Sequence, residues 1–295
     1  AHPVRPTAYQ EINNFYTATV YEKGAEIIGM LRTLIGQEAY RRSTDLYFER
    51  HDGEACTIED WLKVFEDVTG RDLTQFALWY HQAGTPRVSV TRRDDGDALV
   101  LEFTQEIPDT PGQSGKKPHL IPVAVGAIAE DGSEAEPTRL VELTEARQEV
   151  RLAPGTAGTV PSILRGFSAP VVLTQTLSHD ERALLLRHDT DGFVKWEAAR
   201  GLAKEALIRM VTEGAVPDPA FLEALAPVIL DESLDPAFRA LVTGLPSDDD
   251  MAQTLADGGT TPDPAAIADA RRSMVEALAR HMQDDLPGLH DRMAV

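Results

Sequence analysis

The sequence predicts a multidomain α+β protein, in which a helical segment, a small β-sandwich and the start of an α-helical solenoid follow one another. The spacing of apolar residues is the first observation, because it changes from helical to alternating at Pro86 and returns to helical near His179. The length is the second, since 295 residues exceed one typical domain and suggest two or three. We therefore expect domains at residues 1–84, 85–178 and 179–295.

The first segment has the pattern of four consecutive helices. A second helix is expected from about residue 37 to 50, Thr57 begins a capping-box sequence before a third, and residues 73–82 form one more. Gly36 is a stop signal for the first helix. The apolar stripe of that first helix, at i, i+3, i+4 and i+7 spacing, consists of Ile27, Ile28, Leu31, Leu34 and Ile35.

The middle segment has the two-residue period of strands. Val88 and Val90 alternate with polar residues, and Asp95-Gly96 is a hairpin signal. Further strands are expected at 121–128, 139–143, 149–152 and 171–174. Short strands at this spacing are typical of a small antiparallel sandwich, which we interpret as a structural spacer.

The last segment returns to short helices joined by Pro, Gly or Asp turns, at 180–186, 194–213, 219–229, 236–242, 248–256 and 264–284. Successive short helices suggest an α-solenoid, although no strict repeat period is present. From Arg187 onward the chain has 20 acidic and 10 basic residues. Such a charge is typical of a solvated face. The alternative is an acidic concave wall that attracts the positively charged N-termini of peptides.

Composition excludes several classes of partner. The net charge of −20 argues against nucleic acid and anionic membrane surfaces. The one cysteine, Cys56, cannot form an internal disulfide and fits a reducing compartment; we interpret it as a small residue near a helix start, not as a nucleophile. The most apolar run, 120–129, is too short to span a bilayer, and the first residues lack a signal-peptide pattern. We expect a soluble, cytoplasmic protein.

The strongest functional candidates lie in the stretch from residue 9 to 28, where Tyr16 and Tyr21 are five residues apart. A tyrosine hydroxyl is a neutral hydrogen-bond donor at neutral pH, and a donor aimed at a carbonyl under attack stabilises the developing oxyanion. The structural alternative is that both rings simply pack beside a helix start. Spacing alone does not decide between these interpretations.

The amino-acid sequence of this stretch adds further evidence. NNFYTATVYEKGAEII resembles the segment of the bacterial aminopeptidase N family that contains the catalytic tyrosine of these zinc exopeptidases. The resemblance continues through AHPVRP, LYFERHDG, WYHQAGTP, KKPHLIPVAVG, LRGFSAPV, RHDTDGFVKWEA and LPSDDDMA, in the same order. It implies that residues 1–84 are the C-terminal part of a thermolysin-like peptidase domain. Because the chain starts in mid-motif, we expect an internal fragment of such an enzyme.

The resemblance assigns three site residues. Tyr21 matches the tyrosine of the family's VYEKG motif, whose hydroxyl donates to the oxyanion of the tetrahedral intermediate. Tyr16 matches a second active-site aromatic, which lines the pocket for the first side chain of the substrate. Asn13 matches an asparagine near that pocket and has a supporting role, with a simple turn residue as the alternative.

The metal-binding part of the family pattern is missing. The family holds zinc through an HExxH helix and a later glutamate, but none of the eight histidines here precedes a glutamate. The family's GAMEN stretch is also absent. HDTDG, at 188–192, lacks the spacing of a calcium loop, so we expect capping or turn roles for Asp189 and Asp191. His51-Asp52-Gly53 is interpreted as a turn, and His281 and His290 have no partner at ligand spacing.

We therefore expect zinc in the parent enzyme, no metal in this chain, and no activity from the chain alone. The partners implied are peptides with a free N-terminus, and a former domain interface could support self-association. A non-catalytic acidic scaffold of sandwich and solenoid is the alternative from another class. An independent hydrolase that uses carboxylates is a third, but no pair of carboxylates is fixed by spacing.

Overall fold

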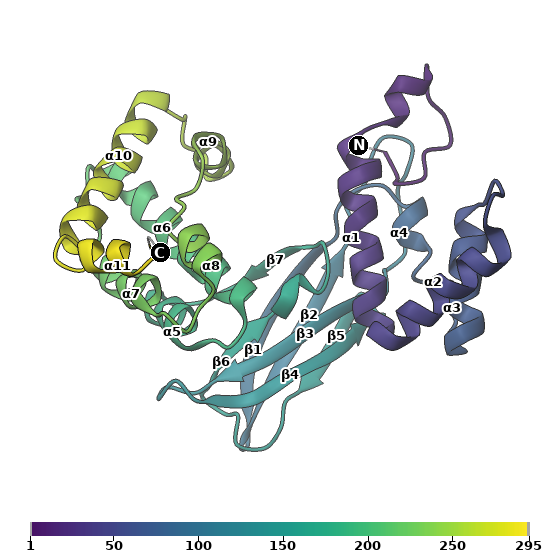
Figure 1. The fold of residues 1–295 in the computed structure, drawn as a ribbon, viewed down its shortest axis with the longest axis horizontal. Helices are drawn as coiled ribbons and strands as arrows, with labels where there is room; N and C mark the ends of the chain where they lie inside the picture. Colours follow the sequence, from purple (N-terminus) through teal and green to yellow (C-terminus); the bar gives the residue numbers. More distant parts are fainter. Residues whose placement is uncertain (1, 294–295) are drawn as a thin grey trace. The chain divides into compact units, whose positions relative to one another are not determined.

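The computed structural model describes residues 2–293, which form two compact units. The first unit comprises Ala1–Gly126, Glu136–Thr159 and Ile163–Thr176, and the second Ala127–Ala135, Val160–Ser162 and Leu177–Val295. Figure 1 labels their helices and strands. The predicted division at residues 84 and 178 stays a prediction, and each unit is described by itself.

The first unit begins with a short 3₁₀ helix, η1 (Ile12–Phe15), which the sequence analysis did not predict. The helices that follow are α1 (Ala18–Ile35), α2 (Gln37–His51), α3 (Ile58–Thr69) and α4 (Leu78–His81). The buried face of α1 consists of Ile27, Met30, Leu31 and Leu34. Ile28, expected in this stripe, is 39% exposed, because i+1 positions point to different sides of a helix.

The predicted helix ends at Gly36 and Thr57 are confirmed. Gly36 follows α1 with φ of 83°, which favours glycine. Thr57 Oγ1 accepts a hydrogen bond of 3.2 Å from the Asp60 N–H, and the Asp60 carboxylate accepts one of 2.9 Å from the Thr57 N–H. Two otherwise unpaired donors at the start of α3 are thereby satisfied.

The helix predicted over residues 73–82 is mostly wrong, since only Leu78–His81 is helical. The Asp72 carboxylate accepts a hydrogen bond of 2.8 Å from the Thr74 N–H and starts a turn instead. Gln75 Nε2 then donates to the carbonyl oxygens of Pro118 and Thr144, at 3.1 and 2.7 Å. These contacts come from distant parts of the chain, so local periodicity does not reveal them.

Two sheets form the predicted sandwich. One sheet has the order β5-β2-β1-β7 and the other β4-β3-β6. The strands are β1 (Arg87–Asp95), β2 (Ala98–Glu106), β3 (Ile121–Ile128), β4 (Glu134–Leu143), β5 (Arg147–Arg151), β6 (Val160–Ile163) and β7 (Val172–Gln175). β6 was not predicted. β7 pairs in parallel with β1, so the sandwich that was expected to be antiparallel contains a parallel pair.

The hairpin predicted at Asp95-Gly96 is confirmed, because β1 and β2 pair antiparallel with Asp95 opposite Ala98. Val88 and Val90 are buried while their neighbours on β1 are exposed, as a strand with one core face requires. All eight residues of β3 are buried, so this strand lies in the sandwich core.

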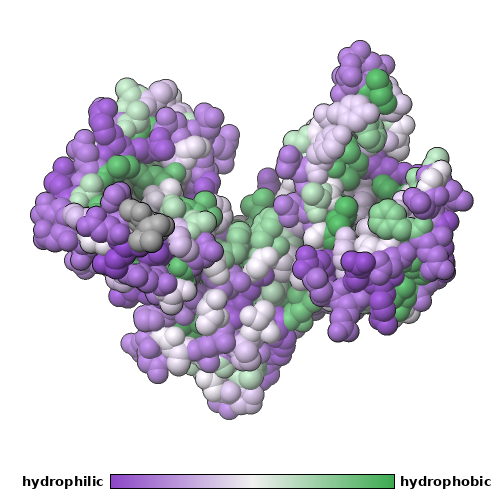
Figure 2. Space-filling model, in the orientation of Figure 1, coloured by the Kyte–Doolittle hydropathy of each residue, from purple (hydrophilic) through white to green (hydrophobic). Residues whose placement is uncertain are grey.

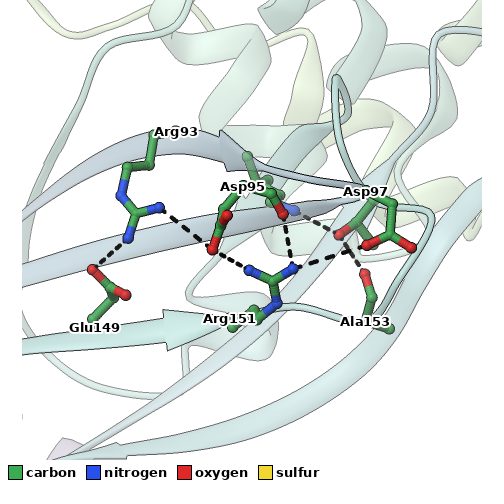
Figure 3. A network of polar contacts seen from close by, with 8 residues as sticks. Arg93, Asp95, Asp97, Glu149, Arg151 and Ala153 are labelled. Atoms are coloured by element: carbon green, nitrogen blue, oxygen red, sulfur yellow. Dashed lines mark hydrogen bonds and ion pairs between the residues drawn. The ribbon is translucent and has the colours of Figure 1, made fainter.

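Charged side chains connect the strands on the outer part of the β5-β2-β1 sheet (Figure 3). Arg93 donates to Glu149 at 2.8 Å, across β2. Arg151 pairs with the Asp95 carboxylate and donates to the Asp95 carbonyl oxygen at 2.8 Å. These side chains are about half exposed, so each pair contributes little to stability.

The second unit has the helical composition expected of the solenoid. Its helices are α5 (His179–His188), α6 (Gly192–Glu213), α7 (Pro219–Leu230), α8 (Pro236–Val242), α9 (Asp248–Asp257), α10 (Pro264–His281) and α11 (Leu286–Met293). All six predicted helices are present, α10 ends three residues earlier than expected, and α11 was not predicted. Its core includes Leu186, Leu202 and Leu225, which are fully buried. Among the described residues, no helix has the length and apolarity needed to span a membrane.

Candidate functional site

Four aromatic side chains form a row at the start of the first unit, and we call Tyr9, Phe15, Tyr16 and Tyr21 the aromatic row. Phe15 lies edge-on to both Tyr9 and Tyr16, with ring centroids 6.1 and 5.9 Å apart. Tyr16 and Tyr21 are stacked at 6.1 Å with their planes 26° apart. The structure thus brings the two predicted site tyrosines together.

Both tyrosines face solvent within this chain. Tyr16 is 58% exposed and Tyr21 60%. Figure 2 shows separate apolar patches along α1. Tyr9, Ile12 and Ile28 are also exposed in this part of the chain. Neither tyrosine is a core residue of this chain, although the two rings pack on each other. Large exposed rings that stack on each other form one side of a surface on which another group can bind.

Hydrogen bonds of a short turn and of a helix cap hold the row in place. The η1 turn is closed by reciprocal bonds of Glu11 and Asn14. Thr17 is the N-cap of α1: its hydroxyl accepts from the Val20 N–H at 3.4 Å and lies 3.0 Å from His2 Nε2. Tyr21 therefore lies in the first turns of α1, where the helix direction is fixed by its cap.

Asn13 lies in η1 and is exposed. Its carbonyl oxygen accepts a hydrogen bond of 3.3 Å from the Tyr16 N–H. The turn interpretation of Asn13 thus has a direct structural basis, and its backbone positions the residue that carries the second ring. No contact of its side chain decides the supporting role implied by the resemblance.

Lys23 lies in α1, two residues after Tyr21, and its side chain anchors this helix to a distant part of the chain. Its ammonium donates to the Gly84 carbonyl oxygen at 2.7 Å and lies 5.7 Å from the centre of the Trp79 ring. Burial, and to a smaller extent the charge of Lys116, lower the pKa of Lys23 to about 8. Sequence reasoning missed this residue, although Lys23 and Trp79 both lie inside the quoted motifs VYEKG and WYHQAGTP.

Trp79 and His119 form the support beneath Lys23, and we call these three residues the Trp79 cluster. Both rings are fully buried and stack with centroids 4.6 Å apart. Trp79 Nε1 donates to the Leu120 carbonyl oxygen at 2.8 Å. Burial, and next the charge of Lys23, lower the pKa of His119 to about 4, so its imidazole is neutral at pH 7.

Asp189 and Asp191 of the HDTDG segment have the turn and capping roles expected of them. Asp191 is the N-cap of α6 and accepts from the Val194 N–H at 3.0 Å. Asp189 accepts from the Asp191 N–H at 2.9 Å. His290 is 81% exposed beside Asp291. These groups are explained by local structure.

Three family descriptions match consecutive parts of the chain. Residues 1–80 match the Peptidase family M1 domain. Residues 84–176 match a domain of unknown function (DUF3458) with an Ig-like fold, and residues 179–295 match its C-terminal companion, DUF3458_C, with ARM repeats. The predicted architecture of peptidase segment, sandwich and solenoid is thereby confirmed.

Over its whole length, this chain is similar to bacterial proteins called aminopeptidase N. The Caulobacter vibrioides protein is 43% identical over 100% of this chain and 34% of its own length. The Escherichia coli protein is 37% identical over 99% of this chain and 35% of its own length. The crystal structure of Legionella pneumophila aminopeptidase A in complex with aspartic acid superposes with a TM-score of 0.85 at 27% identity, covering 100% of this chain and 34% of that one.

The chain thus spans about a third of the length of the relatives it matches. The exposed tyrosine pair lies in the part that matches the M1 peptidase domain. Along its whole length this chain is a homologue of proteobacterial proteins called aminopeptidase N, and its residues 1–80 match the Peptidase family M1 domain.

Proposed function

We propose that this chain is part of an aminopeptidase that removes N-terminal residues from peptides with broad specificity. The observation that carries the proposal is the exposed, stacked pair of Tyr16 and Tyr21 in a chain aligned throughout with proteins called aminopeptidase N. The domain division at residues 84 and 178 is part of the proposal, and so is a cytoplasmic location, which the one cysteine and the charge of −20 support.

Tyr21 is the proposed catalytic residue. Its hydroxyl donates a hydrogen bond to the oxygen of the scissile carbonyl as that oxygen becomes an oxyanion. A positioned donor of this kind lowers the barrier by about 2.7–4 kcal/mol, or roughly 10²–10³ in rate. Stacking on Tyr16 limits the rotation of the Tyr21 ring, and Lys23 fixes the helix that carries it. Tyr16 and Asn13 border the pocket for the first side chain of the substrate.

The zinc of the family does not fit this chain alone. Its ligands come from an HExxH helix, and no histidine here precedes a glutamate. No mechanistic step through zinc is therefore assigned to these residues. The isolated chain should release no p-nitroaniline from aminoacyl anilides, and turnover by this chain would overturn that part of the proposal.

A chimera tests the catalytic role directly. This chain would replace the matching third of the Caulobacter vibrioides protein, to which it aligns over 100% of its length. We expect the chimera to hydrolyse aminoacyl anilides, and Tyr21→Phe to lower kcat by about 10²–10³ with little change in KM, because the donor acts in the transition state.

Tyr9→Phe is the matched control, since it removes a hydroxyl from the same aromatic row without a proposed role in the reaction. Its kcat should equal that of the chimera. If Tyr21→Phe is as active as Tyr9→Phe, or if it loses bound zinc, the oxyanion role is wrong.

Self-association is a further part of the proposal. The exposed rings of the aromatic row support it, because large exposed apolar side chains promote contacts between copies. Sedimentation of the isolated chain over a range of concentrations would test it, and a monomer at every concentration would contradict it.

A further inference from the structure

Three side chains of different chemistry converge where α2 ends. His51 is the last residue of α2, and Cys56 directly precedes the N-cap of α3. The chain reverses between them at Gly53, whose φ is 77°, and the Glu54 N–H donates to the His51 carbonyl oxygen at 3.1 Å. A ring nitrogen of His51, a carboxylate oxygen of Glu54 and Cys56 Sγ all lie within 4.8 Å of one another.

These distances approach those of a tetrahedral metal site. Metal–ligand bonds of about 2.0–2.3 Å place neighbouring ligands of a tetrahedron about 3.3–3.7 Å apart. The distance from His51 Nδ1 to Glu54 Oε2 is already 3.3 Å. The Glu54 side chain is 64% exposed, so it can rotate by the small amount that the remaining distances require. One coordination position stays open to water on this exposed side.

The donor set selects the class of metal. A thiolate, an imidazole and a carboxylate suit Zn²⁺ and similar divalent transition metals, whereas Ca²⁺ and Mg²⁺ prefer oxygen ligands alone. The sequence analysis interpreted His51-Asp52-Gly53 as a turn and Cys56 as a small residue near a helix start. Both interpretations describe the backbone correctly, but neither explains why three side-chain donors face one another.

One neighbour of Cys56, the Tyr47 hydroxyl, suits a metal-bound thiolate. The Cys56 thiol also makes long contacts, as a donor, with the carbonyl oxygens of His51 and Glu54, at 3.8 and 3.7 Å, and it gives these up when it loses its proton. The Tyr47 hydroxyl hydrogen-bonds with Cys56. A phenol hydroxyl in this position can donate to a thiolate and orient it. The Tyr47 ring in turn packs against His51, with centroids 5.5 Å apart.

We propose that His51, Glu54 and Cys56 bind a Zn²⁺-class transition-metal ion, with water as the fourth ligand. When the ion binds, a metal–sulfur bond forms, the S–H bond of Cys56 breaks, and the proton leaves to solvent. The site fastens the end of α2 to the start of α3. It does not rest on the proposed peptidase function, because none of its ligands belongs to the tyrosine pair.

Cobalt(II) is the probe for the first test, since its bond to a thiolate gives a charge-transfer absorption in the near-ultraviolet. The 295-residue chain, free of any histidine tag, would be titrated with Co²⁺ under reducing conditions. We expect one ion per chain, the thiolate band, and loss of that band when Zn²⁺ is added. Absence of the band at saturating Co²⁺ would overturn the proposal.

Variants of each ligand give the second test. Cys56→Ser should abolish the band, and His51→Gln and Glu54→Gln should each weaken Zn²⁺ binding by about ten-fold or more. His290→Gln is the matched control and should bind the metal as the parent chain does. His290 is exposed, and it lies far from His51 in the sequence. Equal binding by Cys56→Ser and the parent, or equal loss in His290→Gln, would contradict the site.

Folding and enzymatic activity are measured separately from metal binding. Glu54 is exposed, so Glu54→Gln should keep the circular-dichroism spectrum and melting temperature of the metal-free chain. A low affinity in this variant therefore reports ligation and not unfolding. Hydrolysis of aminoacyl anilides by the chimera is independent of these measurements, so failure of one proposal leaves the other intact.

Discussion

The aromatic row and the Trp79 cluster lie in the same compact unit and are built from similar side chains, yet they differ in almost every physical respect. Tyr16 and Tyr21 are 58% and 60% exposed, whereas Trp79 and His119 are fully buried. Trp79 has a hydrogen-bond partner for its only polar atom. The row is held mainly by its own turn and helix cap. The comparison teaches that aromatic residues at a helix start can form an exposed binding surface, while the buried rings of Trp79 and His119 stabilise the unit.

Lys23 connects the two regions. It lies two residues after Tyr21, and its ammonium contacts both the Gly84 carbonyl oxygen and the face of Trp79. The position of the exposed pair therefore depends on the buried cluster. Substitutions in the cluster should change stability, whereas Tyr21→Phe in the row should change function alone.

Trp79→Ala should have the largest effect on stability. The ring is fully buried, and its removal leaves a cavity and an unpaired Leu120 carbonyl oxygen. We expect a loss of roughly 3–5 kcal/mol in the free energy of unfolding, measured by urea denaturation. The control Trp196→Ala removes a partly exposed tryptophan from the other unit and should cost less. Equal losses would refute the special role of the Trp79 cluster.

His119 should make stability depend on pH in the acid range. Its pKa is lowered from 6.5 to about 4 in the folded chain, chiefly by burial. Between these values the unfolded chain binds a proton that the folded chain does not, so stability is complete above pH 6.5 and falls as the pH drops towards 4. The loss should be on the order of 3 kcal/mol.

His119→Phe keeps an aromatic ring against Trp79 but cannot titrate, so its stability should fall less over this range. Urea denaturation at a series of pH values measures the difference between the two chains. His290→Phe, at an exposed position, should follow the parent profile. A profile of His119→Phe that coincides with the parent would show that His119 is not the titrating group.

Lys23 should have an effect of comparable size, in the alkaline range. Its pKa is lowered from 10.5 to about 8, chiefly by burial. Between these values the unfolded chain retains a proton that the folded chain loses, so this group raises stability as the pH increases from 8 to 10.5. Lys23→Met should remove that rise, as seen in the difference between the two chains. Lys117→Met, at an exposed lysine, should preserve it.

Tyr21→Phe and Tyr16→Phe should have the smallest effect on stability. Each removes only a hydroxyl from a ring that is more than half exposed, so the free energy of unfolding should change by no more than about 0.5 kcal/mol. Together with the large loss of kcat expected for Tyr21→Phe in the chimera, this result would show that Tyr21 serves function and not stability. A loss of stability as large as that of Trp79→Ala would instead make Tyr21 a structural residue.

The sequence by itself determined the order of architectures, most helix ends and the two candidate tyrosines. These features are local: Gly36 and the Thr57–Asp60 box end or begin helices through backbone geometry and neighbouring bonds. The hairpin at Asp95-Gly96 is also set by its own turn residues. Periodicity failed at residues 73–82, because Gln75 bonds to carbonyl groups some 40 and 70 residues away in the chain.

Only the tertiary structure decided which residues support the site and which side chains meet. The parallel pairing of β7 with β1 joins the first and the last strand of the sandwich along the chain. The two-residue period of apolar residues predicts a strand but does not indicate which other strand it pairs with. Lys23 and Gly84 are 61 residues apart, and their contact exists only in the folded chain. His51, Glu54 and Cys56 are close in sequence, but the left-handed turn at Gly53 decides that their donor atoms converge. Local propensity sets the elements, whereas the directions of side chains follow from how those elements pack.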